Sequence, residues 1–230
     1  GKFKGLRGEN AINEFYRALE THAKNLIKDA KVFRLISYNH LTFVLNNWDR
    51  KFPTTLKCDS YNISKNQAMY GSSEFPIHAY MSDSENGTLP PNRKVPIKDM
   101  GNVALRLKKD HVMGRATLAF DDTMSHYWEV ANELTIVPRP MTQLDRKIWP
   151  LTKWWASGLF DDCVDKAVLS QVENPLAVRR LGDLDNYPEV QIHGDLKLSD
   201  VEKIFVPPDF KEIPSLLQQL DECGIEWEYL

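Results

Sequence analysis

Cysteine is scarce in this 230-residue chain and is not arranged in pairs. Cys58, Cys163 and Cys223 are widely spaced, odd in number and free of any CxxC pattern. That spacing argues against a disulfide framework and against a zinc site built on cysteine. It is typical of a protein that works in a reducing compartment.

Long hydrophobic runs are also missing. No apolar segment approaches the roughly 18 residues that a membrane span requires, and no signal peptide opens the sequence. We therefore expect no membrane partner. The chain begins with Gly1 rather than methionine, so the sequence is compatible with an export segment upstream.

The charge pattern lacks any block of one sign. The formal net charge is −3, and the basic pairs Lys108-Lys109 and Arg179-Arg180 each have an acidic residue within a few positions. A nucleic-acid-binding surface usually shows a clustered excess of lysine and arginine. We expect no nucleic-acid partner.

Several sequence motifs of catalysis and metal binding are absent. The chain has no glycine-rich phosphate loop, no HExxH and no GxSxG. Its six histidines are scattered, and no pair has the spacing of metal ligands. The sequence therefore predicts no metal.

Helical and strand-like patterns are interspersed without a strict βαβ rhythm, which predicts the α+β class. Asn39 is the expected cap of the second helix. We expect a single domain over 1–230, with an N-terminal helical region at 1–31 and a mobile surface loop at 82–99. The patterns predict helices at 9–31, 41–48, 149–170 and 213–222, and strands at 32–37, 54–64, 102–107, 115–120 and 225–229.

The most informative segment is 189–194, which reads Glu-Val-Gln-Ile-His-Gly. Apolar Val190 and Ile192 alternate with Glu189, Gln191 and His193, so three polar side chains share one face of a predicted strand. A turn at residues 194–195 and a second apolar segment follow. Two interpretations stand at equal weight here: a functional site, or an ordinary antiparallel hairpin with its polar face in water.

Two further residues are candidates from their local pattern. Arg34 lies within an apolar strand and needs a carboxylate, a phosphate or backbone carbonyls if it is buried. The alternative is an arginine at a strand edge whose head group reaches solvent. Ser64 precedes a turn, and a serine there is most often a turn former.

The segment 189–194 resembles the terminal signature of mono-ADP-ribosyltransferases, in which a catalytic glutamate begins a strand and a glycine follows five residues later. The apolar continuation from Leu198 to Val206 looks like the last hairpin of that fold. Four blocks also resemble the family of CteC-type bacterial effectors, which modify threonine on ubiquitin. These are 61–66, 115–123, the Glu189 block and 200–210, within a resemblance that spans about 32–229.

The resemblance implies a split mixed β-sheet core with flanking helices, NAD as co-substrate and an Arg-Ser-Glu site. Arg34 would hold a phosphate or ribose of NAD through its forked donors. Ser64 would orient the nicotinamide side of the pocket or the catalytic glutamate. Glu189 would stabilise the positive charge that develops at the anomeric carbon as nicotinamide leaves. Gln191 and His193 would either touch the substrate or support the hairpin.

The sequence also departs from that pattern. Tyr187 stands two residues before Glu189, where many arginine-specific relatives carry Glu or Gln. This departure favours a hydroxyl or another acceptor over arginine, with Tyr187 close to the substrate. The second motif reads Asn62-Ile63-Ser64 instead of Ser-Thr-Ser. We expect a secreted bacterial enzyme that acts in host cytosol, with ubiquitin threonine as the implied acceptor. The alternatives are an NAD glycohydrolase and a non-catalytic binding module.

Overall fold

The computed structural model describes residues 27–47, 50–52, 76–88, 101–119 and 187–230, together with positions 18, 21, 25 and 181. The strand predicted at 54–64 and the helix predicted at 149–170 lie outside these residues, as does most of the N-terminal helical region. The predictions for those segments stay as predictions.

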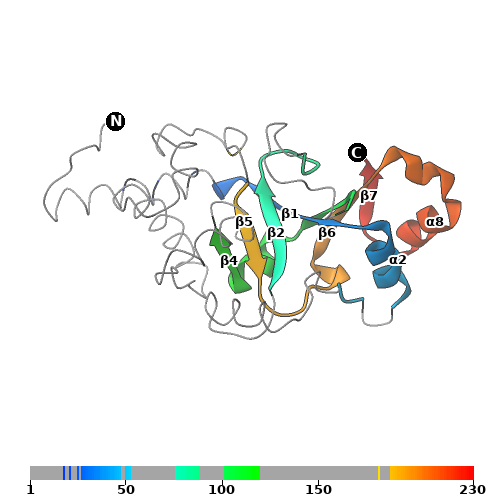
Figure 1. Ribbon diagram of the computed structural model, residues 1–230, viewed down its shortest axis with the longest axis horizontal. Coiled ribbons are helices and arrows are strands. Elements are labelled where there is room, and N and C mark those ends of the chain that lie inside the picture. Colours follow the sequence, from blue (N-terminus) through cyan, green and yellow to red (C-terminus); the bar gives the residue numbers. More distant parts are fainter. Residues whose placement is uncertain are drawn as a thin grey trace, which may run out of the picture.

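Seven described strands form one sheet in the order β4-β5-β2-β1-β3-β6-β7 (Figure 1). Neighbouring strands are antiparallel except β6 and β7, which are parallel. Their bounds are β1 (Lys31–Ile36), β2 (Ile77–Ser82), β3 (Val103–Leu107), β4 (Ala116–Ala119), β5 (Glu189–Ile192), β6 (Val201–Val206) and β7 (Glu226–Tyr229).

Short helices accompany the sheet, and the predicted α+β class with a mixed sheet is confirmed. The α-helices are α2 (Tyr38–Asn46), α4 (Lys109–Val112) and α8 (Pro214–Glu222); the 3-10 helices are η2 (Met113–Arg115), η5 (Leu198–Asp200) and η6 (Pro208–Glu212). Ser37, not Asn39, caps α2, since its hydroxyl oxygen accepts from the backbone N–H of His40 at 3.3 Å.

The predicted hairpin of β5 and β6 is wrong. β5 pairs with β2 and β4, whereas β6 pairs with β3 and β7, so three strands separate them in the sheet. No strand was predicted at 77–82, where β2 lies between β5 and β1. Ser82, the predicted start of a surface loop, is the buried last residue of β2.

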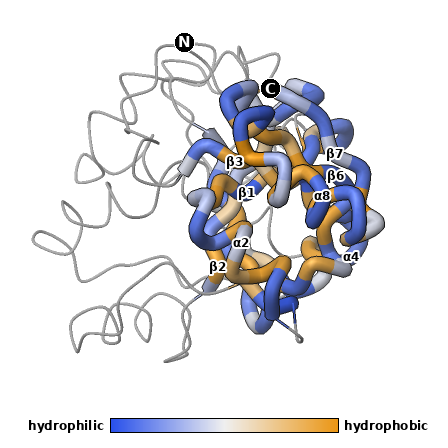
Figure 2. The backbone as a smooth tube through the Cα atoms, turned by 90° about the vertical axis from the view of Figure 1, so that its right-hand side faces the viewer, coloured by the Kyte–Doolittle hydropathy of each residue, from blue (hydrophilic) through white to orange (hydrophobic). Residues whose placement is uncertain are grey.

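The two faces of the sheet have different cores. Arg34 and the apolar residues of α2 and α8 lie on one face, above the largest hydrophobic cluster. The opposite face carries a smaller, mainly aromatic cluster: Phe33, Tyr80, Ala104, Tyr187 and Phe205, with Leu35 packed against it. In Figure 2 the hydrophobic stretches of the chain follow the sheet and the hydrophilic stretches lie mostly at the periphery. This separation decides which predicted site residues can meet.

Gly101 brings the chain into β3 by passing directly against the end of β1. Its φ is +113, and a Cβ placed there would lie 2.1 Å from both the carbonyl carbon and the oxygen of Ile36. No side chain fits between these two backbones. The start of β3 is thus set by a position that only glycine can occupy.

Candidate functional site

Glu189 is the first residue of β5, the strand next to the edge strand β4, and its side chain is buried. The residue is 2% exposed. Its backbone lies between Tyr80 of β2 and Ala119 of β4. The interpretation of this strand as a hairpin with its polar face in water is therefore wrong, because the polar side chains of both Glu189 and Gln191 are buried.

Two side chains bind the same oxygen of Glu189. His78 of β2 places Nδ1 2.8 Å from Oε1, and Gln191 donates from Nε2 to Oε1 at 2.6 Å. A buried carboxylate is costly unless polar partners replace water. These contacts fix one oxygen of Glu189 and so fix the orientation of the whole carboxylate.

Strand register explains how the three side chains meet. Tyr80 is paired with Glu189, and His78 with Gln191, so all four side chains lie on the same face of two adjacent strands. His78 and Glu189 are diagonal neighbours, a distance that an imidazole and a glutamate can bridge. The His78 side chain is 14% exposed, compared with 3% for Glu189. The carboxylate is the deeper of the two groups, and His78 lies closer to the surface.

An aromatic cluster borders the carboxylate. Tyr80 stacks on Phe33 with ring centroids 5.8 Å apart, and Tyr187 meets Tyr80 edge-on at 5.5 Å. The Tyr80 hydroxyl donates to the carbonyl of Gly87 at 2.9 Å, which satisfies its only donor inside the protein. Tyr187, predicted to lie near the substrate, is buried in this cluster. The rings make a rigid apolar wall beside Glu189.

The far end of β5 is held by Arg115. Its Nη1 donates to the carbonyl of His193 at 2.8 Å, and the carbonyl of Arg115 accepts from the His193 N–H at 2.9 Å. Nη2 of Arg115 reaches Asp200 at 3.1 Å. Gly194 follows with φ +79, as the predicted turn requires. His193 thus lies just beyond β5, in the anchored turn.

Arg34 does not join Glu189. The register pairs Arg34 with Leu105, while Glu189 is in line with Tyr80 and Phe33, so Arg34 and Glu189 project from opposite faces of the sheet. Arg34 is 2% exposed, its guanidinium lies 6.0 Å from the centre of the Phe52 ring, and burial lowers its pKa to about 10. Desolvation and, secondarily, the charge of Arg34 lower the pKa of His40 of α2. One dinucleotide cannot be held by both predicted residues in this arrangement.

His78, which contacts the Glu189 carboxylate, was not among the predicted site residues. Ser64, the predicted orienting residue, lies outside the described residues, so its role stays a prediction; His78 is a described side chain that contacts the Glu189 carboxylate. A signal for it exists: in 77–82, Ile77, Ala79 and Met81 alternate with His78, Tyr80 and Ser82. That alternation indicates a strand whose histidine shares a face with a tyrosine.

Within the part of the chain that the structure describes, no group of three or more His, Cys, Asp or Glu side chains is placed to hold a metal ion. No helix there is both long enough and apolar enough to traverse a bilayer. What the site offers chemically is one fixed carboxylate, a histidine in contact with it and an aromatic wall.

No family model matches this chain. Over 126 residues it is 29% identical to the "Gene 2 protein" of Mycobacterium phage L5, a match that covers 52% of this chain and 42% of that protein. The chain therefore matches less than half the length of this curated relative. The name of the relative states no activity.

Proposed function

We propose that this protein is an NAD-dependent mono-ADP-ribosyltransferase whose catalytic carboxylate is Glu189. The observation that carries the proposal is the buried carboxylate at the start of β5, with Oε1 held by His78 and Gln191. The sequence resemblance to the terminal signature of these enzymes supports it, because the matching glutamate is the one that is fixed and buried. The mixed sheet with flanking helices is compatible with that fold.

In the proposed reaction, the bond between the nicotinamide nitrogen and the anomeric carbon of the ribose breaks, and nicotinamide leaves with the electron pair. An acceptor oxygen forms a bond to the same carbon and gives up its proton. Positive charge develops on the ribose before the new bond is complete. A carboxylate that is already oriented stabilises that charge without having to reorganise. This is the role that the proposal gives to Glu189.

The contacts of Glu189 suit this role. His78 and Gln191 both bind Oε1, so the carboxylate cannot rotate freely when the ribose passes through its charged state. The neighbouring aromatic cluster lowers the local polarity, which strengthens any attraction between a carboxylate and a cationic centre. Arg34 has no part in the proposed site, since it lies on the other face of the sheet.

For the acceptor we propose a hydroxyl group on a protein. Tyr187 stands where arginine-specific relatives carry Glu or Gln, and its ring is packed against Tyr80. A threonine of ubiquitin is the acceptor that the CteC-type resemblance implies, for a secreted enzyme acting in host cytosol. The match to a phage protein is a reason to test proteins of a bacterial lysate alongside ubiquitin.

The decisive experiment incubates the purified protein with NAD labelled in its adenylate portion, together with ubiquitin, a eukaryotic lysate or a bacterial lysate. We expect a labelled protein band, with mass spectrometry locating ADP-ribose on a hydroxyl side chain. Glu189→Gln should lower the labelling rate by about a hundredfold or more. Glu202→Gln, an exposed carboxylate on β6, is the matched control and should label at the wild-type rate.

Other outcomes separate the alternatives. Release of nicotinamide at the same rate with and without acceptor protein would indicate an NAD glycohydrolase. Failure of NAD to raise the unfolding temperature would favour a non-catalytic module, because a ligand bound only by the native state must stabilise it. Undiminished labelling by a folded Glu189→Gln variant would exclude Glu189 as the catalytic group.

A further inference from the structure

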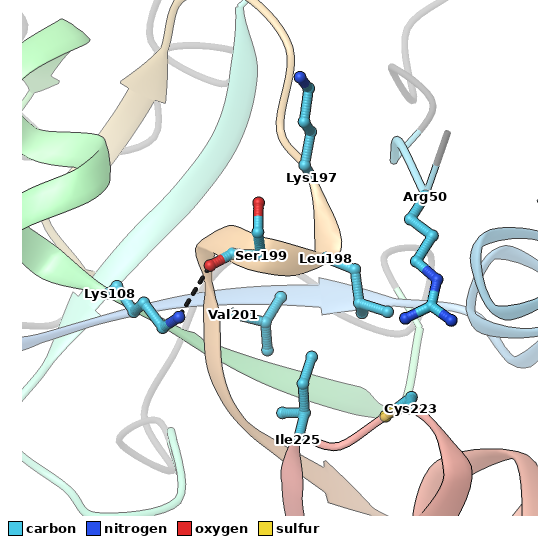
Figure 3. Close-up of a pocket in the computed structure, with 8 residues that line it drawn as sticks. All are labelled: Arg50, Lys108, Lys197, Leu198, Ser199, Val201, Cys223 and Ile225. Atoms are coloured by element: carbon cyan, nitrogen blue, oxygen red, sulfur yellow. Dashed lines mark hydrogen bonds between the residues drawn. The ribbon is translucent and has the colours of Figure 1, made fainter. Parts of the chain in front are cut away.

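A cleft of about 310 Å³ lies on the sheet face opposite Glu189, where β6 begins (Figure 3). Its floor includes Leu198 and Val201, which belong to the hydrophobic cluster of the Arg34 face. Cys223, at the end of α8, and Ile225, just before β7, form the adjoining wall. The volume is at the lower end of the range for small-molecule sites.

Three cations line this cleft: Arg50, Lys108 and Lys197. Among the described residues, none of the three has a carboxylate within 4.0 Å. Asp195 and Asp200, which are close in sequence to Lys197, are each paired with another cation: Asp195 with Lys51 at 2.7 Å and Asp200 with Arg115 at 3.1 Å. In a chain with a net charge of −3, this is a local surplus of positive charge over an apolar floor.

The backbone holds Arg50 in place at the cleft. Arg50 has φ +48, a left-handed conformation that is uncommon for a residue with a side chain. Its carbonyl accepts from the N–H of Leu198 at 2.8 Å, and the next residue, Lys51, forms a β-bridge with Lys197. Such a conformation persists only where surrounding contacts enforce it, and it is frequent at ligand sites.

The three side chains have different directions in Figure 3. The guanidinium of Arg50 points into the cleft toward Cys223. Lys108 lies on the opposite flank, where Nζ donates to the carbonyl of Ser199 at 2.9 Å and has two further hydrogens to donate. Lys197 points away toward the rim. An anion in the cleft would therefore meet Arg50 first, with Lys108 across the apolar floor.

We propose that this cleft binds a small phosphorylated molecule with an apolar or aromatic body. The phosphate would bind Arg50, whose fork of donors matches a tetrahedral oxyanion, and the body would cover Leu198, Val201 and Ile225. A dianion fits the surplus of cations better than one carboxylate does. The cleft is independent of Glu189 and of the reaction proposed there.

The test compares four probes with the full chain: phenyl phosphate, benzoate, inorganic phosphate and benzyl alcohol. Calorimetry measures affinity, and the rate of alkylation of Cys223 by iodoacetamide, followed on its own peptide by mass spectrometry, locates the site. We expect phenyl phosphate to bind at least about tenfold more tightly than each other probe, and to protect Cys223. Binding should be unchanged in Glu189→Gln.

Matched variants assign the contacts. Arg50→Gln and Lys108→Gln should each weaken phenyl phosphate binding by about tenfold, whereas Lys211→Gln, an exposed lysine of η6, should not. If Arg50→Gln does not fold, the affinity of Lys108→Gln and the protection of Cys223 still test whether the cleft binds phenyl phosphate. Equal affinity for benzoate would overturn the assignment to phosphate. Absence of binding, or binding that leaves Cys223 unprotected, would overturn the site.

Discussion

His78 and Glu189 meet from adjacent strands with 2.8 Å between Nδ1 and Oε1, although they are 111 residues apart in the sequence. The contact leaves His78 nearer the surface and Glu189 deeper. It makes His78 a positioning residue for the proposed catalytic carboxylate. That role can be separated from a purely structural one by kinetics.

His78→Ala should lower kcat for NAD-dependent labelling by about ten- to a hundredfold, since a hydrogen bond to a charged group contributes about 1.5–3 kcal/mol. His78→Gln, which retains a donor, should recover part of the loss. KM for NAD should change less than kcat, because the contact orients Glu189. His111→Ala, an exposed histidine near Asp200, is the control. A kcat equal to wild type in folded His78→Ala would contradict this role.

We expect Arg34 to stabilise the fold and not to bind NAD. Arg34→Ala removes a buried side chain beside Phe52 and should lower the free energy of unfolding by about 3 kcal/mol. Arg34→Met keeps most of the apolar length and should lose less. Urea unfolding measures both. Folded Arg34→Met should label its acceptor with the wild-type KM for NAD; a large rise in that KM would restore Arg34 as a ligand of NAD.

Gly101→Ala should be among the most destabilising single substitutions in the described part of the chain. The new methyl would lie 2.1 Å from the backbone of Ile36, so either β1 or the entry to β3 must move. We expect a loss of more than about 3 kcal/mol. Gly114→Ala is the control, because a Cβ there meets no atom within 4 Å. Comparable unfolding midpoints for these two variants would show that β3 can start elsewhere.

Lys203 should make the attachment of β7 to β6 depend on pH. Hydrogen bonds to Glu226 and then to Glu228 raise the pKa of Lys203 above 10.5, and the bond to Lys203 lowers the pKa of Glu226 below 4.5. The contribution of Lys203 to the free energy of unfolding is fully present below pH 10.5. It disappears as pH rises through the higher pKa that Lys203 has in the folded protein. The contribution of Glu226 to the free energy of unfolding is present above pH 4.5. It disappears as pH falls through the lower pKa that Glu226 has in the folded protein.

The difference in unfolding temperature between wild type and Lys203→Met should therefore be largest near neutral pH and shrink toward both extremes. Thermal unfolding in a pH series measures it. Lys211→Met, in η6, supplies the baseline for the loss of one positive charge. A difference that stays constant through the acid range would mean that the ion pair with Glu226 contributes nothing to the attachment.

Local patterns in the sequence predicted several elements to within a residue or two. Three strands, Lys31–Ile36, Val103–Leu107 and Ala116–Ala119, lie where strands were predicted, because the pattern of residues within each segment was enough to indicate a strand. Helix α8 ends beside Gly224, as expected. The opposite faces of Phe33 and Arg34 were also predictable, because side chains alternate along a strand.

Pairing between distant segments was not predictable in the same way. The proximity of Glu189 and His78 depends on β5 entering the sheet beside β2, and no local pattern encodes that choice. The predicted hairpin of β5 and β6 failed for this reason: the two strands are neighbours in sequence, yet each finds a better partner elsewhere. The same choice of partners separates Arg34 from Glu189.

The position of β5 has a consequence for when the site can form during synthesis. β2 and β4 are translated well before β5, which then fills the place between them. Pairings over such sequence distances are slow to form because a long loop must close first. A ribosome-bound chain that stops short of residue 189 lacks both the carboxylate and the strand that joins β4 to the sheet. The NAD-dependent activity proposed for Glu189 should therefore appear only after β5 has been synthesised.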